Sequence, residues 1–166
     1  MSNKKVKMMS FDTSSTISGI AYWENAVCTK SGILYHAKEN DAIIRVENMC
    51  NDLISRLKEF NPSIVVIECP PYCNNPATLI MLAEIVGCVK GWAITNYADY
   101  VEYPVDRWRK LVADEGEVIP TRSKEAKIWD IEKFKILTGK EPEDDNEADA
   151  YLIGQARINE FRQYVL

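Results

Sequence analysis

Nitrogen and sulfur ligands for metals are scarce in this sequence. His36 is the only histidine, and the five cysteines are an odd number without the paired spacing of a zinc site. Cys69 and Cys73 stand four residues apart, but no matching Cys or His pair accompanies them. A zinc module is therefore excluded, and the cysteines are expected to be reduced and mostly buried. His36 follows a predicted strand without a partner motif and is assigned a structural role.

Long apolar runs and targeting signals are missing as well. The basic start of the chain, residues 1–5, precedes only a strand-length apolar segment, which argues against a secretory signal. No apolar run is expected to reach the length of a membrane span, and no repeat, low-complexity tract or linker interrupts the 166 residues. The sequence therefore predicts one cytoplasmic domain over 1–166 with no membrane association, and its 46% hydrophobic content suits a sizeable core.

A positive net charge is absent too, because the formal charge is −5. The distribution is uneven: segment 141–149 carries six acids, whereas segment 121–140 carries six bases against three acids. An acidic pocket beside a basic stretch suits a metal-dependent nuclease, since the pocket binds cations while the rim binds the phosphate backbone. A solvated helix with mixed charges is the alternative, and the charges alone favour it.

Apolar periodicity predicts a mixed α/β domain. Short alternating or continuous apolar runs indicate strands, and spacings of three and four residues indicate helices, with Asp41 and Asn75 as N-caps. The run at 63–68 is apolar on successive residues, as in a central strand buried on both faces. The expected strands are 6–12, 17–23, 27–34, 63–68 and 101–103, and the expected helices are 41–60, 77–97, 104–112, 123–137 and 147–164.

Two of the apolar strands end in an acid. Asp12 closes the first strand, before Thr-Ser-Ser-Thr, and Glu68 closes the fourth, before Cys-Pro-Pro. Asp12 by itself has a structural alternative, because Asp, Ser and Thr are ordinary turn residues. Glu68 is costly to bury unpaired and needs either a metal ion or a neighbouring Lys or Arg. Carboxylates gathered from strand ends are typical of sites that hold a hard cation such as Mg²⁺ for phosphodiester chemistry.

A third acidic group opens the last predicted helix. Asp145 and Asp149 are four residues apart, and Asn146 and Asp149 are three apart, so each pair shares a helix face. Helix capping is the alternative, since Asp144 and Glu147 have capping-box spacing and acids suit a helix N-terminus. Apolar neighbours at this end of the helix indicate partial burial, which favours a functional role for Asp149.

The ordered motifs Phe-Asp-Thr-Ser-x4-Gly-Ile-Ala, Val-Ile-Glu and Glu-Ala-Asp-Ala resemble those of the RuvC family of Holliday junction resolvases. The resemblance covers nearly the whole chain, and the spacing and chain length are similar to those of phage-encoded members, which would act in the host cytoplasm. It implies an RNase H-like fold, with a mixed central β-sheet flanked by helices. It also implies a homodimer and four acidic residues that hold Mg²⁺, with two ions per site and Mn²⁺ as a substitute.

The family's acids are carried over one by one. Asp12 matches the first acid, Glu68 the second and Asp149 the last. Where the family usually has the remaining acid, this chain has Asn146, so the resemblance implies a third ligand from either Asp145 or the carbonyl oxygen of Asn146.

The resemblance also implies DNA contacts. Tyr72 lies in the loop after Glu68 and matches, shifted by one residue, an aromatic that inserts at the junction centre; packing against its own proline loop is the alternative. The family's DNA-backbone segment resembles a set of bases for which surface solubility is the alternative reading: Arg109, Lys110, Arg122, Lys124 and Lys127.

The implied activity is Mg²⁺-dependent hydrolysis of phosphodiesters at Holliday junctions or other branched DNA, by paired nicks from a homodimer. The catalytic acids are expected to be Asp12, Glu68, Asp145 and Asp149. An actin-like or sugar-kinase-like ATP-binding protein is the main alternative, but it needs a glycine-rich phosphate loop, and the seven glycines include no clustered pair. A junction-binding module without catalysis is a second alternative, motivated by Asn146. No helicase partner can be named from the sequence.

Overall fold

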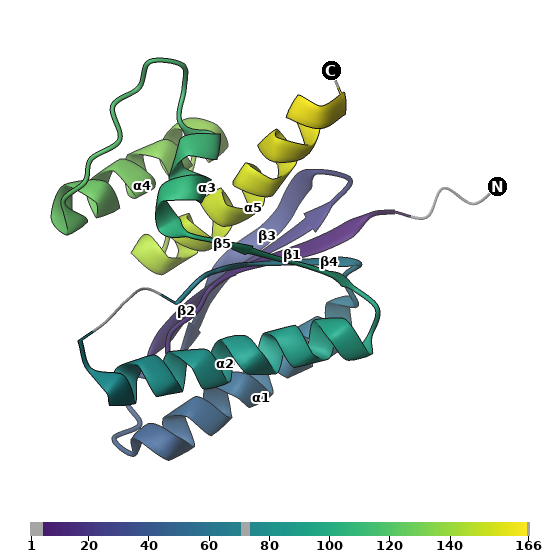
Figure 1. Ribbon diagram of the computed structural model, residues 1–166, viewed down its shortest axis with the longest axis vertical. Helices are drawn as coiled ribbons and strands as arrows, with labels where there is room; N and C mark the ends of the chain where they lie inside the picture. The colour runs from purple at the N-terminus through teal and green to yellow at the C-terminus, as the bar shows by residue number, and fades with distance from the viewer. Residues whose placement is uncertain (1–4, 71–73, 166) are drawn as a thin grey trace.

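The protein consists of one five-stranded sheet with helices on both faces (Figure 1). It is described here from a computed structural model that covers residues 5–70 and 74–165. The elements follow one another as β1 (Lys7–Asp12), β2 (Ile17–Glu24), β3 (Val27–Tyr35), α1 (Ala42–Phe60), β4 (Ile64–Glu68), α2 (Pro76–Thr95), β5 (Asp99–Tyr103), α3 (Val105–Val112), α4 (Ser123–Thr138) and α5 (Asp145–Val165). All ten predicted elements are present, and the predicted mixed α/β fold is confirmed.

The sheet has the strand order β3-β2-β1-β4-β5. The first three strands pair antiparallel, whereas β4 runs parallel to both β1 and β5. The carboxyl ends of β1 and β4 therefore lie at the same edge of the sheet, with Phe11 opposite Ile67 one residue before each strand-end acid. This edge is where the sequence places its two isolated carboxylates.

Two apolar layers cover the sheet. Helices α1 and α2 lie on one face, and α3, α4 and α5 lie on the other (Figure 1). Side chains of β4 alternate between the layers, since Val65 and Ile67 pack toward α1 and α2 while Val66 packs toward α5. Burial on both faces explains the continuous apolar run of this strand and confirms that it is central.

Helix α5 packs closely against β1 and β2, with polar and glycine contacts that leave little room. The Ser10 hydroxyl donates to the Ala150 carbonyl at 2.7 Å and accepts from the Trp23 indole at 3.0 Å. A Cβ added to Gly19 would lie 1.8 Å from the carbonyl oxygen of Asn146. Only glycine therefore allows the first turn of α5 to approach β2 this closely.

The helix starts follow local capping chemistry. Asp41 caps α1 by accepting from Ile43 N at 2.9 Å, and Asn75 caps α2 by accepting from Ala77 N at 3.0 Å, as predicted. Helix α5 begins at Asp145, two residues earlier than predicted, because the Asp144 carboxylate accepts from the backbone N–H of Glu147 at 3.0 Å.

The prediction that no segment reaches membrane-span length was wrong. Helix α2, Pro76–Thr95, has a mean hydropathy of 1.6 and is long and apolar enough to cross a membrane by length and composition alone, and 28% of its apolar stretch is buried inside the protein. Core helices of folded domains pass the same test. The buried side of α2 includes Ile85, Val89 and Trp92, which belong to the core layer shared with α1 and the sheet.

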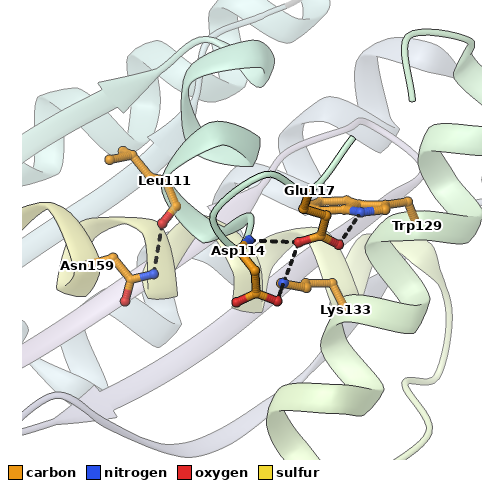
Figure 2. A network of polar contacts seen from close by, with 6 residues as sticks. All are labelled: Leu111, Asp114, Glu117, Trp129, Lys133 and Asn159. Carbon is orange, nitrogen blue, oxygen red and sulfur yellow. Dashed lines mark hydrogen bonds and ion pairs between the residues drawn. The ribbon is translucent and has the colours of Figure 1, made fainter. Parts of the chain in front are cut away.

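A buried lysine forms ion pairs with the segment that connects α3 to α4 (Figure 2). Lys133 donates to Asp114 at 2.6 Å and to Glu117 at 2.7 Å, and Glu117 also accepts from the Trp129 indole at 2.8 Å. These contacts attach the connection to α4, and α3 and α4 both pack on α5; α3, the connection and α4 are together called the α3–α4 unit.

Candidate active site

The strand-end acids Asp12 and Glu68 meet at one edge of the sheet and are joined there by Asp149 from α5. Parallel pairing of β1 and β4 brings Asp12 and Glu68 together, and the close approach of α5 to Gly19 adds Asp149. The electrostatic interactions follow the same grouping, because Asp149 is affected by both Asp12 and Glu68. The three acids carried over from the family motif therefore converge from three separate elements.

Burial and mutual repulsion make these carboxylates hard to ionise without a cation. Burial, followed by repulsion from Glu68 and Asp145, raises the pKa of Asp12 to about 8. Burial, followed by repulsion from Asp12, raises the pKa of Asp149 well above its ordinary value. Burial also raises the pKa of Glu68, against the opposing effect of a hydrogen bond from Trp108. A divalent cation is the group that would relieve this repulsion.

The residues fit a hard cation by their chemistry and by one unsatisfied atom. Asp149 Oδ1 is buried and has no hydrogen-bond partner. Carboxylate oxygens are the ligands that Mg²⁺ prefers. As the side chains lie, residues 5–70 and 74–165 contain no group of three acidic, His or Cys side chains arranged to hold a metal. Binding of an ion would therefore require these side chains to rotate.

The two candidates for the third ligand lie in different surroundings. Asp145 forms an ion pair with Lys127, and its charge raises the pKa of Asp12. The Asn146 amide nitrogen donates to Asp144 Oδ2 at 2.9 Å, so its carbonyl oxygen is the atom with ligand chemistry. Lys127, expected to contact DNA, thus has a carboxylate partner within the acidic group.

Arg109, predicted to contact the DNA backbone, is bound to a buried acid of α4, and its DNA contact stays a prediction. Its guanidinium group forms two bonds with Asp130, Nε–Oδ1 at 3.0 Å and NH2–Oδ2 at 2.6 Å, and Asp130 is completely buried. Burial lowers the pKa of Arg109, but Asp130 more than offsets this effect, and the net pKa is raised. This pairing engages two of the five guanidinium N–H groups, so Arg109 is less available to phosphate than the exposed bases.

The other predicted DNA contacts divide into two groups. Lys110, Arg122 and Lys124 are exposed on the α3–α4 unit, where Lys110 lies 3.8 Å from Asp106 and Arg122 lies 3.8 Å from Glu125. Ion pairs of this length at the surface are weak and leave the bases accessible. Tyr72 lies outside the described residues, so its stacking role stays a prediction.

Sequence reasoning missed two residues of this site. Trp108 donates its indole N–H to Glu68 Oε2 at 2.6 Å, and Asp130 lies close enough to Asp149 to raise its pKa. A signal for Asp130 was present, because it falls on the buried face of α4 together with Ala126, Trp129, Lys133 and Phe134. An acid on a buried helix face needs a partner, and here the partner is Arg109.

The histidine, the tryptophans and the cysteines were predicted to have structural roles, and their contacts and burial are as follows. His36 contacts Asp52 of α1 at 3.0 Å. All four tryptophans are buried, as expected for core side chains. Four described cysteines are free thiols, and each is half-buried where mostly buried thiols were predicted: Cys28, Cys50, Cys69 and Cys88.

Comparison with solved structures finds the same architecture in RuvC proteins. No protein-family model and no curated sequence matches this chain. Thermus thermophilus RuvC in complex with a Holliday junction substrate matches with a TM-score of 0.72 at 15% identity, over 95% of this chain and 96% of that chain. A second T. thermophilus RuvC structure matches with a TM-score of 0.72 at 15% identity, over 96% and 97% of the two chains. The yeast mitochondrial Holliday junction resolvase matches with a TM-score of 0.54 at 12% identity, over 97% and 85%. The chain therefore has the RNase H-like α/β fold in the form seen in RuvC-type Holliday junction resolvases.

Proposed function

We propose that the protein is a Mg²⁺-dependent, structure-selective endonuclease that cleaves phosphodiesters at Holliday junctions or other branched DNA. The observation that carries this proposal is the convergence of Asp12, Glu68 and Asp149 at one sheet edge, where burial and repulsion favour a bound cation. A neighbour with the same fold is described in complex with a Holliday junction. The near full-length match to RuvC chains leaves the ATP-binding alternative without support.

The chain's own residues would hold two Mg²⁺ ions, with Mn²⁺ as a substitute, through Asp12, Glu68 and Asp149 together with Asp145 or Asn146. When bound, such ions supply the Lewis acidity that activates a water molecule and stabilises a leaving 3′ oxygen. Asp12 interacts with the second strand-end acid, Glu68, and with the helix acid Asp145, which supports a ligand role for it. Glu68 accepts a hydrogen bond from Trp108, and the Arg109–Asp130 pair lies next to the site.

DNA would be held by the exposed bases of the α3–α4 unit. Lys110, Arg122 and Lys124 carry charge without a buried partner and can bind phosphates without reading sequence. Tyr72, in the loop after Glu68, remains the candidate for stacking on an unpaired base at the branch point.

We further propose that two copies pair through α2, so that two sites make paired nicks. The exposed side of α2 presents Ile80, Ala83, Gly87, Gly91 and Ile94 at spacings of three and four residues. Ile80 is 58% and Ile94 63% exposed, and neither glycine has an atom near its missing Cβ. The small residues on this side let two helices approach closely, although the exposed Glu84 lies beside them, and a two-fold pair would repeat the same contact.

Sedimentation tests the pairing. We expect a dimer at micromolar concentration and a shift to monomer for Ile80→Glu. The matched control is Ile136→Glu, which changes a more exposed isoleucine on α4, 73% exposed, and should leave the dimer intact. A wild-type monomer at this concentration would remove the dimer from the proposal.

The nuclease itself is tested with a synthetic four-way junction and Mg²⁺. We expect nicking by the wild type, and none by Asp12→Asn or Glu68→Gln, while both variants still bind the junction. Binding without cleavage by the wild type would favour the non-catalytic junction module that Asn146 suggests. Absence of both binding and cleavage, on junctions, forks and flaps alike, would overturn the proposal.

A further inference from the structure

Trp108 contributes the shortest indole hydrogen bond of the described residues, and its acceptor is a strand-end acid. The indole Nε1 lies 2.6 Å from Glu68 Oε2. The other two indole hydrogen bonds of the described residues are longer, Trp129 to Glu117 at 2.8 Å and Trp23 to Ser10 at 3.0 Å. Hydrogen bonds to charged acceptors are shorter and stronger than neutral ones, so this contact restrains Glu68.

We infer that Trp108 is a positioning residue for Glu68: its indole N–H holds one carboxylate oxygen in place, so that the group presents its other oxygen to the metal site. This inference rests on the metal-binding part of the proposed function. Glutamate has three side-chain torsions, and a fixed hydrogen bond to one oxygen removes much of that freedom before a cation arrives.

The local chain path explains how Trp108 reaches Glu68. Glu68 is paired with Tyr103 at the end of β5, and Cys69 N donates to the Tyr103 carbonyl at 2.8 Å. Pro104 follows at once and leads into α3, which carries Trp108 one turn along. The pairing of β4 with β5, and the direct step from β5 into α3, therefore bring the indole N–H to the Glu68 carboxylate.

The donor is rigid because α3 is fixed on both sides. Trp108 is completely buried. The next residue, Arg109, holds Asp130 of α4, and the Leu111 carbonyl accepts from Asn159 Nδ2 of α5 at 2.8 Å (Figure 2). A donor held by its neighbours costs no reorganisation when Glu68 binds a cation, which is the arrangement expected of a residue that supports a ligand.

Trp129 offers a matched control within the same chain. It is also a buried tryptophan whose indole donates to a glutamate, here Glu117 (Figure 2). Glu117 is bonded to Lys133 and to the α3–α4 connection, and is not one of the proposed metal ligands. Trp108→Phe and Trp129→Phe therefore remove the same kind of hydrogen bond, one at the proposed site and one away from it.

The first experiment is calorimetric titration of the metal-free protein with Mn²⁺ and Mg²⁺. We expect Trp108→Phe to bind the metal about 10- to 100-fold more weakly than wild type, the usual cost of removing a group that supports a metal ligand. Trp129→Phe should stay within about twofold of wild type. Equal affinity of the two variants would mean that Trp108 only fills space and would overturn the inference, and so would a wild-type protein that binds neither ion.

A second experiment needs no folded variant at position 108. In ¹⁵N-labelled wild-type protein, the indole N–H signal of Trp108 should shift during Mg²⁺ titration with the same midpoint as the calorimetric curve, while the Trp129 signal stays in place. A stationary Trp108 signal in a protein that binds Mg²⁺ would overturn the inference.

The outcomes separate this inference from the proposed nuclease function. If Trp108→Phe binds metal more weakly than the wild type but the wild type cleaves no branched DNA, the positioning role is retained and the nuclease function is removed. Cleavage by the wild type, with equal metal affinity in both tryptophan variants, would do the reverse. Junction binding without metal should be unchanged in Trp108→Phe, because Trp108 is buried and offers no surface to DNA.

Discussion

Arg109 and Asp130 form a bidentate ion pair, with Asp130 completely buried and the Arg109 side chain 16% exposed. The pair joins α3 to α4 on the inner side of Asp149. Asp130 raises the pKa of Asp149, whereas Arg109 lowers it. Arg109 is therefore an internal counter-ion of the carboxylate group and neighbours the residues proposed to bind metal.

Removing the arginine should be strongly destabilising. We expect Arg109→Met to lower the free energy of unfolding by about 3–5 kcal/mol, because Asp130 would remain buried without a partner. The measurement is urea denaturation at neutral pH. Lys110→Met, which changes the exposed neighbouring base, should cost less than about 0.5 kcal/mol. A double change to Arg109→Met and Asp130→Leu should recover most of the loss; equal effects of the Arg109 and Lys110 variants would contradict the finding.

Gly19 should not tolerate even a methyl group. In Gly19→Ala the new Cβ would meet the Asn146 carbonyl oxygen, so α5 must move away from β2. We expect a loss of about 1–3 kcal/mol in unfolding free energy and weaker metal binding, since Asp149 moves with α5. Gly87→Ala is the control at a concentration where the protein is monomeric: within one copy its Cβ meets nothing, and it should stabilise α2 by about 0.5–1 kcal/mol. Denaturation and metal titration of both variants provide the check.

The identity of the third ligand can be assigned by two separate substitutions. We expect Asp145→Asn to weaken Mg²⁺ binding more than Asn146→Ala, because the Asp145 charge reaches Asp12 whereas Asn146 offers only a neutral oxygen. Lys127→Met should strengthen binding, since it releases Asp145 from its ion pair. Calorimetric titration of the three variants measures these effects. The opposite order for the first two would assign the position to Asn146.

Cys88 should be the most reactive of the four described thiols at neutral pH. A hydrogen bond from Cys50 lowers the pKa of Cys88 to about 7, despite partial burial. Burial raises the pKa of Cys28 to about 11. We expect iodoacetamide to modify Cys88 first at pH 7.5, as read by peptide mass spectrometry, and more slowly after Cys50→Ala. Equal rates for Cys28 and Cys88 in the folded protein would contradict the pairing.

Glu160 should make stability depend on acid pH. Burial by itself raises the pKa of Glu160, but hydrogen bonds from Tyr103, Arg107 and Arg157 outweigh it and lower the pKa below the ordinary value of 4.5. The stabilisation is therefore present above the unfolded-state pKa and is lost as pH falls through the folded-state value. We expect Glu160→Gln to be destabilised at pH 7, by a margin that narrows between pH 5 and pH 3. Urea denaturation across this range measures it, and Glu59→Gln, an exposed acid on α1, should show no such trend.

Local patterns were sufficient to predict the ten elements, because apolar periodicity and capping residues act within a few positions along the chain. Differences appear at element ends, where β5 begins at Asp99 rather than at residue 101 and α5 begins at Asp145. The start of β5 depends on pairing of Asp99 with Ile64 of β4, and the start of α5 depends on capping by Asp144. The length of α2 was underestimated as an apolar segment because Glu84 and Lys90 interrupt it in the sequence, although both are exposed on the helix.

The partners of charged side chains could not be read in the same way. Arg109 and Lys110 are neighbours with the same charge, yet one is buried against Asp130 and the other is exposed. Trp108 and Glu68 are 40 residues apart, and Arg109 and Asp130 are 21 apart. Such pairs form only when helices pack, and no periodicity marks which base will meet which acid.

The sequence by itself determined that Asp12 and Glu68 end two buried strands and that Asp149 lies on a partly buried helix face, because strand length, direction of the apolar run and helical spacing are local properties. The tertiary structure decided what these acids face. Parallel pairing brings Asp12 beside Glu68, and the space left at Gly19 admits α5. The packing of α3 supplies Trp108 and Arg109 behind them, since long-range packing alone determines which donors reach a buried carboxylate.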